Sequence, residues 1–229
     1  MCGRFTLATP AAEWAALFDV EPLGVAPRFN IAPTDSVVLV RRSVHDGARE
    51  SVLLRWGLVP EWTRTPADIP LLINARRETI GTKPSFRDAF QQRRGLVIAD
   101  GFYEWKPDAG GKRPFWIHLP GERPFAMAAI WEVWPGTAHQ PEIASCAIVT
   151  TSASEDLAVV HDRMPVVFEP GQAHRWIDPE CDRDELAELM EPGAVGRFSL
   201  REVSPRVNNV RNDDESCLHP TETQPNLFE

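Results

Sequence analysis

The chain has 229 residues, of which 43% are hydrophobic and 25% charged, a balance that is typical of globular proteins and excludes an intrinsically disordered chain. It contains no apolar run of the roughly 18–20 residues that span a bilayer, and no apolar secretion signal follows Met1. Its formal net charge of −9, taken alone, argues against a nucleic-acid partner.

This charge is unevenly distributed along the chain. Residues 1–118 carry 16 Lys+Arg and 13 Asp+Glu, whereas residues 119–229 carry 8 and 20. Seven carboxylates lie within residues 178–191, where residues 183–190 predict a surface helix with a solvated acidic face. The first half of the chain can therefore form a narrow basic groove on an otherwise acidic protein.

Three further helices are predicted in chain order. Thr9 can cap the first, with Pro10 at its first position and Trp14 on its apolar face. Pro84 can open the second, and Ser152-x-x-Glu155 has the capping-box pattern that predicts a third before residues 157–160. Short β-prone runs between Pro and Gly residues predict strands at 37–41, 52–56, 96–99, 115–119, 125–130, 143–150 and 165–168.

Many strands with scattered helices predict a single α+β domain over residues 1–211, with curled, barrel-like antiparallel sheets and peripheral helices. The polar, acidic residues 212–229 predict a disordered tail. The cysteines are far apart and form no C-x-x-C pair, so we expect no zinc site, no disulfide framework and a cytoplasmic location. We also expect no other cofactor, no membrane association and a monomer. These cysteines are Cys2, Cys146, Cys181 and Cys217.

Cys2 is the first candidate for chemistry. Small residues after Met1 permit its removal by methionine aminopeptidase, and the mature chain would then begin at Cys2. An N-terminal α-amine has a pKa of about 7.7–8.0, so a useful fraction is neutral at pH 7. Such an amine can condense with an aldehyde, and the thiol of the same residue can close a five-membered thiazolidine; the thiolate alone can instead attack an acyl carbon. The alternative is an ordinary buried cysteine.

Other polar residues lie in apolar or aromatic surroundings. Asn74 and Arg76 follow an apolar run, and could orient an amine and hold a phosphate or merely satisfy a turn. Glu104 lies between aromatic residues and could exchange protons, or pair with an arginine. His161 is the residue type that usually exchanges protons near pH 7, although a lone histidine at a helix end is more often structural.

Basic and aromatic residues also alternate, as at Arg4-Phe5, Arg28-Phe29-Asn30 and Trp62-Thr63-Arg64. This mixture suits single-stranded nucleic acid, because bases stack on rings while phosphates meet arginines. With eight tryptophans in the chain, most are expected in the core.

Nine segments in order resemble the SOS-response-associated peptidase family. Four of them are Met-Cys-Gly-Arg-Phe at 1–5, Arg-Phe-Asn-Ile-Ala-Pro at 28–33, Trp-Gly-Leu-Val-Pro-x-Trp at 56–62 and Asn-Ala-Arg-x-Glu-Thr at 74–79. The others are Ala-Asp-Gly-Phe-Tyr-Glu-Trp-Lys at 99–106, Phe-Ala-Met-Ala-Ala-Ile-Trp at 125–131, Ile-Val-Thr at 148–150, His-Asp-Arg-Met-Pro at 161–165, and residues 203–210. The resemblance runs from Cys2 to about Arg211.

This resemblance implies a protein that recognises abasic sites in single-stranded DNA and links to them covalently through Cys2, protecting the lesion during replication. It also implies self-removal of Met1, an associated DNA lyase activity and association with the nucleoid once crosslinked. By resemblance, Asn74 positions the Cys2 amine, Glu104 acts near the amine and sugar, and His161 acts at the ring oxygen. The implied DNA contacts are Arg4, Arg76 and Arg163 to phosphates, and Asn30, Pro33, Trp62 and Thr150 along the strand.

Two departures from the family leave the route of the DNA strand undetermined near Trp62 and Pro84. Some relatives carry two aromatic residues where this chain has Trp62-Thr63. Relatives present basic and apolar wedge residues near Phe86, where this chain has Pro84-Ser85.

Two other functions compete with this one. Met-Cys-Gly also opens N-terminal nucleophile amidohydrolases such as glutamine amidotransferases, in which Cys2 would attack an amide. A non-catalytic single-strand binding module would bind DNA in a salt-sensitive way that is indifferent to the lesion. Separately, Gln224, Leu227 and Phe228 resemble the Q-x-x-L-F peptide by which bacterial proteins dock on the sliding clamp.

Overall fold

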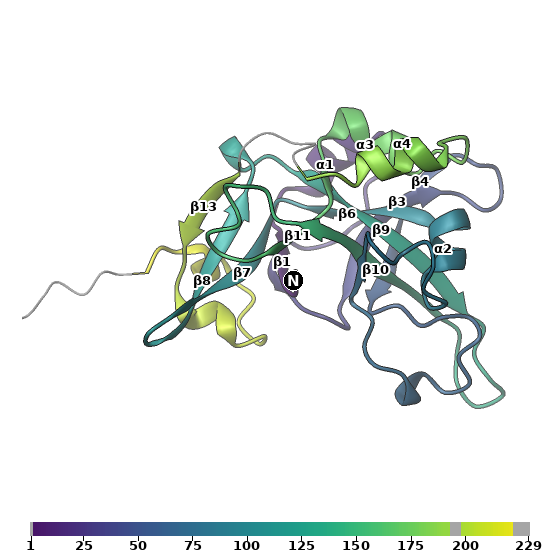
Figure 1. Ribbon diagram of the computed structural model, residues 1–229, viewed down its shortest axis with the longest axis horizontal. Helices are drawn as coiled ribbons and strands as arrows, with labels where there is room; N and C mark the ends of the chain where they lie inside the picture. Colours follow the sequence, from purple (N-terminus) through teal and green to yellow (C-terminus); the bar gives the residue numbers. More distant parts are fainter. Residues whose placement is uncertain (1, 193–197, 222–229) are drawn as a thin grey trace, which may run out of the picture.

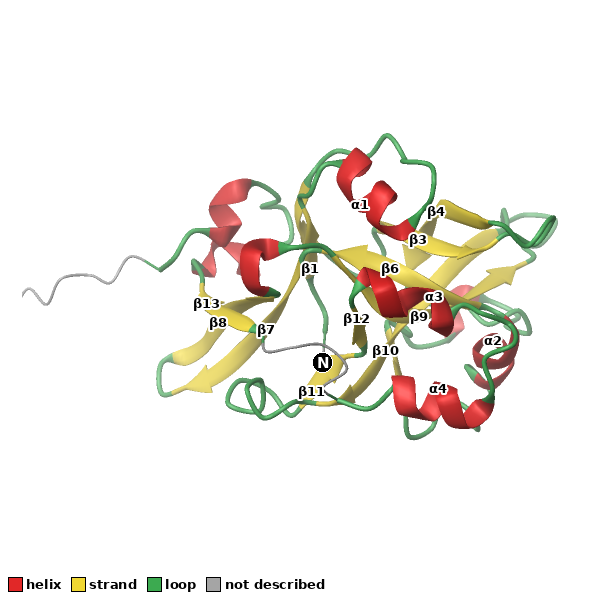
Figure 2. Cartoon of the chain, turned by 90° about the horizontal axis from the view of Figure 1, so that it is seen from above, coloured by secondary structure: helices red, strands yellow, loops and turns green. Residues whose placement is uncertain are grey.

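Two β-sheets form the centre of the computed structural model, which describes residues 2–192 and 198–221. Figure 1 shows the smaller sheet on the left and the larger on the right, with β1 lying between the body of the smaller sheet and strands β10 and β11. Helices α1, α3 and α4 lie along one side of the larger sheet, as the view from above also shows (Figure 2). The described chain therefore places its first residues where the two sheets meet.

The larger sheet is ring-like. Its strand order within the described residues is β11-β10-β4-β3-β6-β9-β12, with β5 beside β10, and a further pairing of β10 with β9 closes a ring. Strand β10 runs parallel to β4 and β5 and antiparallel to β9 and β11, so the sheet is mixed rather than purely antiparallel. The strands are β3 (Ser36–Arg42), β4 (Arg49–Trp56), β5 (Asn74–Arg76), β6 (Arg94–Ala99), β9 (Phe125–Trp134), β10 (Ile143–Ser152), β11 (Arg163–Pro165) and β12 (Val167–Phe168).

The smaller sheet has the order β13-β8-β7-β1-β2. A Cβ atom on Gly101 would lie 2.1 Å from Trp116 Nε1, so only glycine lets the Trp116 ring lie this close to the start of β7. The adjacent Asp100 carboxylate accepts hydrogen bonds from the backbone N–H groups of Ala8 (2.6 Å) and Thr9 (2.8 Å), which fixes the end of β1. These strands are β1 (Phe5–Leu7), β2 (Arg28–Ile31), β7 (Gly101–Asp108), β8 (Gly111–His118) and β13 (Ser199–Glu202).

The helices are short and peripheral, and α2 and α3 pack against β6 and β9. The first helix begins after Pro10 rather than after Thr9, because the Thr9 hydroxyl donates to Asp100 (3.0 Å). The acidic helix is confirmed, with the Asp182 carboxylate accepting the N–H groups of its first turn. The four helices are α1 (Ala11–Phe18), α2 (Arg87–Gln92), α3 (Pro170–Trp176) and α4 (Arg183–Leu189).

The prediction of a helix after Ser152 is wrong. Ser152 pairs with Arg163 as the last residue of β10, so its hydroxyl does not cap a helix, and residues 155–160 form turns. The predicted α+β class with curled sheets and peripheral helices is confirmed, and the apolar strand runs supply most of the core. No described helix is long and apolar enough to cross a membrane.

The packed chain extends beyond the expected boundary at residue 211. Residues 215–218 form a short 3-10 helix that buries Cys217, and the Asp213 carboxylate accepts the N–H groups of Phe29 (2.6 Å) and Asn30 (2.7 Å) on β2. Part of the expected disordered tail is therefore docked on the smaller sheet. Gln224, Leu227 and Phe228 lie outside the described residues.

Candidate active site where the two sheets meet

Cys2 is fixed from both sheets. The Tyr103 N–H of β7 donates to the Arg4 carbonyl (2.9 Å), which sets the chain before β1 beside β7. From β5 of the larger sheet, Asn74 Nδ2 donates to the Cys2 carbonyl oxygen (2.9 Å). The Cys2 side chain is fully buried, and burial together with the negative charge of Glu104 raises the pKa of its thiol. Cys2 is therefore held as a neutral thiol near the Glu104 carboxyl group.

Asn74 carries a second polar atom at this position. Its Oδ1 is buried and accepts no hydrogen bond from the residues that the structure describes. A buried acceptor of this kind usually has a donor in the functional state of a protein. The Asn74 side chain can therefore accept one further N–H group next to Cys2.

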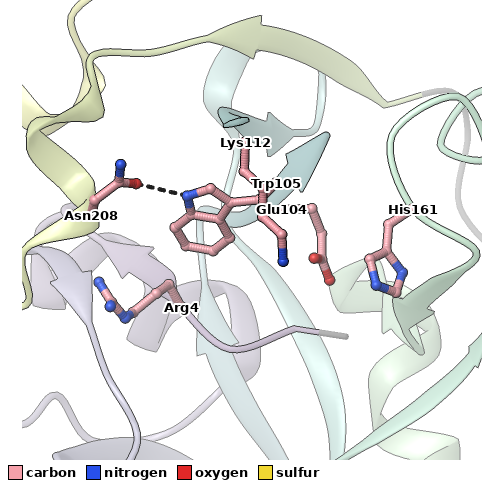
Figure 3. A pocket seen from close by; sticks show the side chains of 6 residues that line it. All are labelled: Arg4, Glu104, Trp105, Lys112, His161 and Asn208. Atoms are coloured by element: carbon pink, nitrogen blue, oxygen red, sulfur yellow. Dashed lines mark hydrogen bonds between the residues drawn. The ribbon is translucent and has the colours of Figure 1, made fainter. Parts of the chain in front are cut away.

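A cavity of about 570 Å³ opens at this meeting point. Glu104, which is 4% exposed, reaches it from β7, and His161 reaches it from the turn before β11. Figure 3 shows the Glu104 carboxylate and the His161 ring pointing toward one another across the cavity. The lining residues are Arg4, Glu104, Trp105, Lys112, His161 and Asn208.

Three of these lining residues were missed from the sequence. Trp105 and Asn208 lie in segments that carry the family resemblance, but neither stood out by residue type. Lys112 lies near the tip of the β7–β8 hairpin, opposite Pro107, and only that pairing brings it to the cavity. The Gly110-Gly111 pair was the available signal, because it marks a tight hairpin turn.

The His161 ring is oriented by its own loop. Its Nδ1 accepts the Arg163 backbone N–H (2.9 Å) and lies 2.9 Å from Asp162 Oδ1. In the neutral ring Nδ1 accepts from Arg163, and in the imidazolium it donates to Asp162; in both forms Nε2 carries a proton. His161 can therefore present an N–H donor from that second nitrogen.

Arg4 and Asn30 form one unit rather than two separate surface contacts. Arg4 Nη1 donates to Asn30 Oδ1 (2.8 Å) and to the Val207 carbonyl (3.0 Å). Asn30 is buried, and its Nδ2 donates to the carbonyls of Val207, Asn209 and Asn212. Partial burial lowers the pKa of Arg4, although a guanidinium stays charged in proteins. Asn30 therefore holds Arg4 and the C-terminal loop rather than lining an open groove.

Arg163 and Arg76 differ in how freely they could meet a phosphate. Arg163 donates from Nη2 to the Thr150 carbonyl (2.7 Å) and to Glu78 Oε2 (3.1 Å), and this pairing lowers the pKa of Glu78. Thr150 is buried beneath it. Arg76 lies exposed at the end of β5, and no described residue forms an ion pair with it.

Neither Trp62 nor Pro33 lines the cavity described above, which we call the Cys2 cavity because Cys2 is buried near its Glu104. The Trp62 side chain is 59% exposed and lines a second cavity of about 510 Å³, together with Pro84, Ser85 and Glu132. Pro33 is half-buried between β2 and β3. The structure thus brings Cys2, Asn74, Glu104, His161 and Arg4 together, with Arg76 on the same strand as Asn74 and Arg163 beside His161. Asn30 and Thr150 are buried, and neither Trp62 nor Pro33 lines the Cys2 cavity.

Comparisons with a family model, with individual proteins and with solved structures agree with one another. A family model described as SOS response associated peptidase (SRAP) matches residues 1–210. Abasic site processing protein YedK of Escherichia coli (strain K12) is 34% identical over 96% of this chain and 100% of that protein. Abasic site processing protein YoqW of Bacillus subtilis (strain 168) is 34% identical over 95% of this chain and 99% of that protein. The crystal structure of a protein from Bacteroides thetaiotaomicron shares the fold, with a TM-score of 0.86 and 22% identity over 96% of this chain and 99% of that one.

Proposed function

This chain belongs to the SOS-response-associated peptidase family, and we propose that it processes abasic sites by linking itself covalently to them in single-stranded DNA through the α-amine and thiol of Cys2. Two similar proteins of nearly the same length are named for abasic-site processing, which supports the lesion as the substrate. The reaction requires that Met1 be removed, by methionine aminopeptidase or by the protein itself, because only an N-terminal cysteine has both groups.

The first step opens the sugar and forms an imine. An abasic deoxyribose is mostly a closed hemiacetal, so its ring oxygen must receive a proton before C1′ becomes an aldehyde carbon. His161 supplies that proton from Nε2 in its imidazolium form and is left as the neutral ring, and Glu104 shuttles protons at the amine and C1′. The neutral Cys2 amine then bonds to C1′, and the aldehyde oxygen leaves as water.

The second step closes the ring. The Cys2 sulfur bonds to C1′ across the C=N bond, and the thiol proton moves to nitrogen, giving a thiazolidine. One water is lost overall, and nothing is oxidised or reduced. The thiol follows the amine in this sequence, because the sulfur adds to a C=N bond that exists only after the imine has formed. The DNA lyase activity that the family resemblance implies would begin from the same imine, before the thiol adds.

One observation carries this proposal: Cys2 lies beside Glu104, with its carbonyl fixed by Asn74, next to a cavity that Glu104 shares with His161 and Arg4. The free Asn74 Oδ1 gives the liberated amine an acceptor and orients its lone pair toward C1′. Arg4, Arg76 and Arg163 provide the charges for the phosphates on either side.

The test is a crosslinking gel with a single-stranded oligonucleotide that carries one abasic site. Wild-type protein should form a heat-stable adduct, and Cys2→Ala should lose it. Cys2→Ser keeps the amine but cannot form the thiazolidine, so its adduct should survive heating only after borohydride reduction. Cys146→Ala is the matched control, because Cys146 is equally buried and lies away from the cavity. An equal yield of stable adduct from Cys2→Ala would refute the proposal.

Mass spectrometry of the purified protein tests the requirement for a free N-terminus. The active protein should begin at Cys2, and a retained Met1 in the crosslinked species would contradict the mechanism. Incubation with glutamine separates the amidohydrolase alternative, which predicts ammonia release, from this one, which predicts none.

A further inference from the structure

The second cavity, of about 510 Å³, has no part in the proposed reaction. It lies where α2 meets the end of β9, and Figure 1 shows α2 on the side of the larger sheet that faces away from the smaller one. Its apolar lining residues are Pro60, Trp62, Pro84, Ala89 and Pro135. The family resemblance implies a DNA contact for Trp62, so the surroundings of this side chain bear directly on which partner it meets.

Trp62 projects from a fixed turn. The Thr63 N–H donates to the Pro60 carbonyl (3.0 Å), and Trp134 Nε1 donates from β9 to the Thr63 carbonyl (2.7 Å). Pro60 and Thr63 are buried at the base of this turn, whereas Trp62 is 59% exposed. A large aromatic side chain on a rigid turn loses little conformational freedom on binding, and tryptophan is enriched at the centres of protein–protein contacts. Trp62 therefore offers a preorganised ring surface to a partner.

Carboxylates set the charge around this ring. The buried Glu132 carboxylate pairs with Arg93 (2.8 Å), and Asp88 pairs with Arg87 on α2 (2.8 Å). Glu61 is exposed, and no described residue forms an ion pair with it. Burial, and to a smaller extent the negative charge of Glu61, raises the pKa of Glu132. The cavity therefore holds negative charge that its own cations do not neutralise, beside an exposed indole.

This combination suits a cationic side chain and opposes a phosphate. A phosphate would meet carboxylates of its own sign. An arginine guanidinium can lie over the face of an indole and donate paired hydrogen bonds to a carboxylate at the same time. The proline and alanine side chains of the cavity add apolar surface for the residues on either side of that arginine. Charge and shape thus favour a protein segment over a nucleic-acid strand.

We propose that the second cavity is a docking site for a basic segment of a partner protein, with one arginine placed between the Trp62 indole and the Glu61 carboxylate. This role goes beyond the proposed function, because the partner would not occupy the Cys2 cavity. One protein molecule would then hold a partner and an abasic site at the same time.

The test titrates the full chain into a fluorescent peptide that alternates arginine with proline, and follows binding by anisotropy. The same peptide with citrulline, a neutral isostere of arginine, should bind at least about ten-fold more weakly. Trp62→Ala should weaken binding of the arginine peptide about 5- to 30-fold, and Glu61→Gln about two- to five-fold. Glu21→Gln is the matched control, since it removes the same charge from an exposed position in the loop after α1 and should leave the affinity unchanged.

The ratio of arginine-peptide to citrulline-peptide affinity is taken within each variant, so a loss of folded protein cancels. Equal binding of the two peptides by wild-type protein, or a Trp62→Ala variant that keeps the full ratio, overturns the docking site. An undamaged single-stranded oligonucleotide tests the other occupant: if Trp62→Ala weakens its binding and the arginine peptide does not bind, a DNA strand covers the groove and the proposal is wrong. Loss of Cys2-dependent crosslinking with peptide binding intact would overturn the proposed function alone.

Discussion

The Cys2 cavity and the Trp62 cavity are similar in size, at about 570 and 510 Å³, but opposite in charge. The first combines Arg4 and Lys112 with the single carboxylate of Glu104. The second combines one cation with three carboxylates; its charged residues are Arg93, Glu61, Asp88 and Glu132. Both have a tryptophan in the wall, so aromatic surface does not distinguish them.

Under the proposed function, this difference explains how a chain of net charge −9 could act on DNA. Phosphates are attracted where cations outnumber carboxylates, and the attraction is local because salt screens charges beyond about 8–10 Å. The negative helix α4 and the acidic second cavity therefore do not prevent DNA from reaching Cys2. The covalent bond of the proposed reaction would also make strong general affinity for DNA unnecessary.

The largest expected effect contrasts two buried glutamates, Glu104 and Glu132. Glu104→Gln should slow crosslinking by about 100- to 10,000-fold, because an amide cannot transfer protons in the reaction. Glu132→Gln should change the rate less than about three-fold, although Glu132 is as deeply buried in the second cavity. Single-turnover crosslinking at saturating DNA measures both, and equal losses would contradict the assignment of the chemistry to the first cavity.

A smaller effect concerns the support of Arg4. Asn30→Ala removes the amide that binds Arg4 and three loop carbonyls, and should cost about 1–3 kcal/mol of unfolding free energy. It should also weaken crosslinking several-fold at low DNA concentration while leaving the rate at saturation unchanged. Denaturant unfolding and a DNA titration measure the two effects. Asn209→Ala is the control, since its side chain is exposed in the same loop and should alter neither.

A third prediction uses salt to locate the DNA strand. Arg76→Gln should reduce the salt slope of DNA affinity by about 0.7, the loss of one phosphate contact on a single strand. Arg87→Gln removes the same charge beside the second cavity, where Arg87 pairs with Asp88, and should leave the slope unchanged. An equal change in both variants would mean that the strand also crosses the acidic cavity.

Much of the fold was predictable because the long strands are apolar runs. The stretch at 125–130 became β9, which is almost wholly buried, and the acidic run became α4. The short strands β1, β2, β5 and β13 were not predicted, since three or four residues carry little periodicity. The longer strand β7 was also not predicted, because its bulky residues alternate with a carboxylate. The helix after Ser152 failed because the sheet pairing of that residue overrode a local capping pattern.

The candidate site was predictable by residue type but not by position. Cys2, Glu104 and His161 stood out as unusual residues in their segments; Glu104 and His161 line one cavity, and Cys2 is buried near Glu104. Asn30 stood out equally but is buried, because the end of β2 turns it toward the C-terminal loop. Lys112 and Asn208 could not be placed, since the hairpin and a loop about 90 residues further along the chain meet only in the folded protein.

The smallest expected effect tests the acidic cavity through its stability. Burial raises the pKa of Glu132, and the ion pair with Arg93 at 2.8 Å only partly opposes this. The folded state then holds the Glu132 proton more tightly than the unfolded state, so this group lowers stability as pH rises from about 4.3, the unfolded carboxyl value, through the raised value. Glu132→Gln removes that titration, and its stability relative to wild type should therefore increase with pH across this window, as urea unfolding at several pH values would measure. A relative stability that instead falls with pH would mean that attraction to Arg93 stabilises the Glu132 carboxylate more than burial destabilises it. The second cavity would then disfavour negative charge less than its three carboxylates suggest.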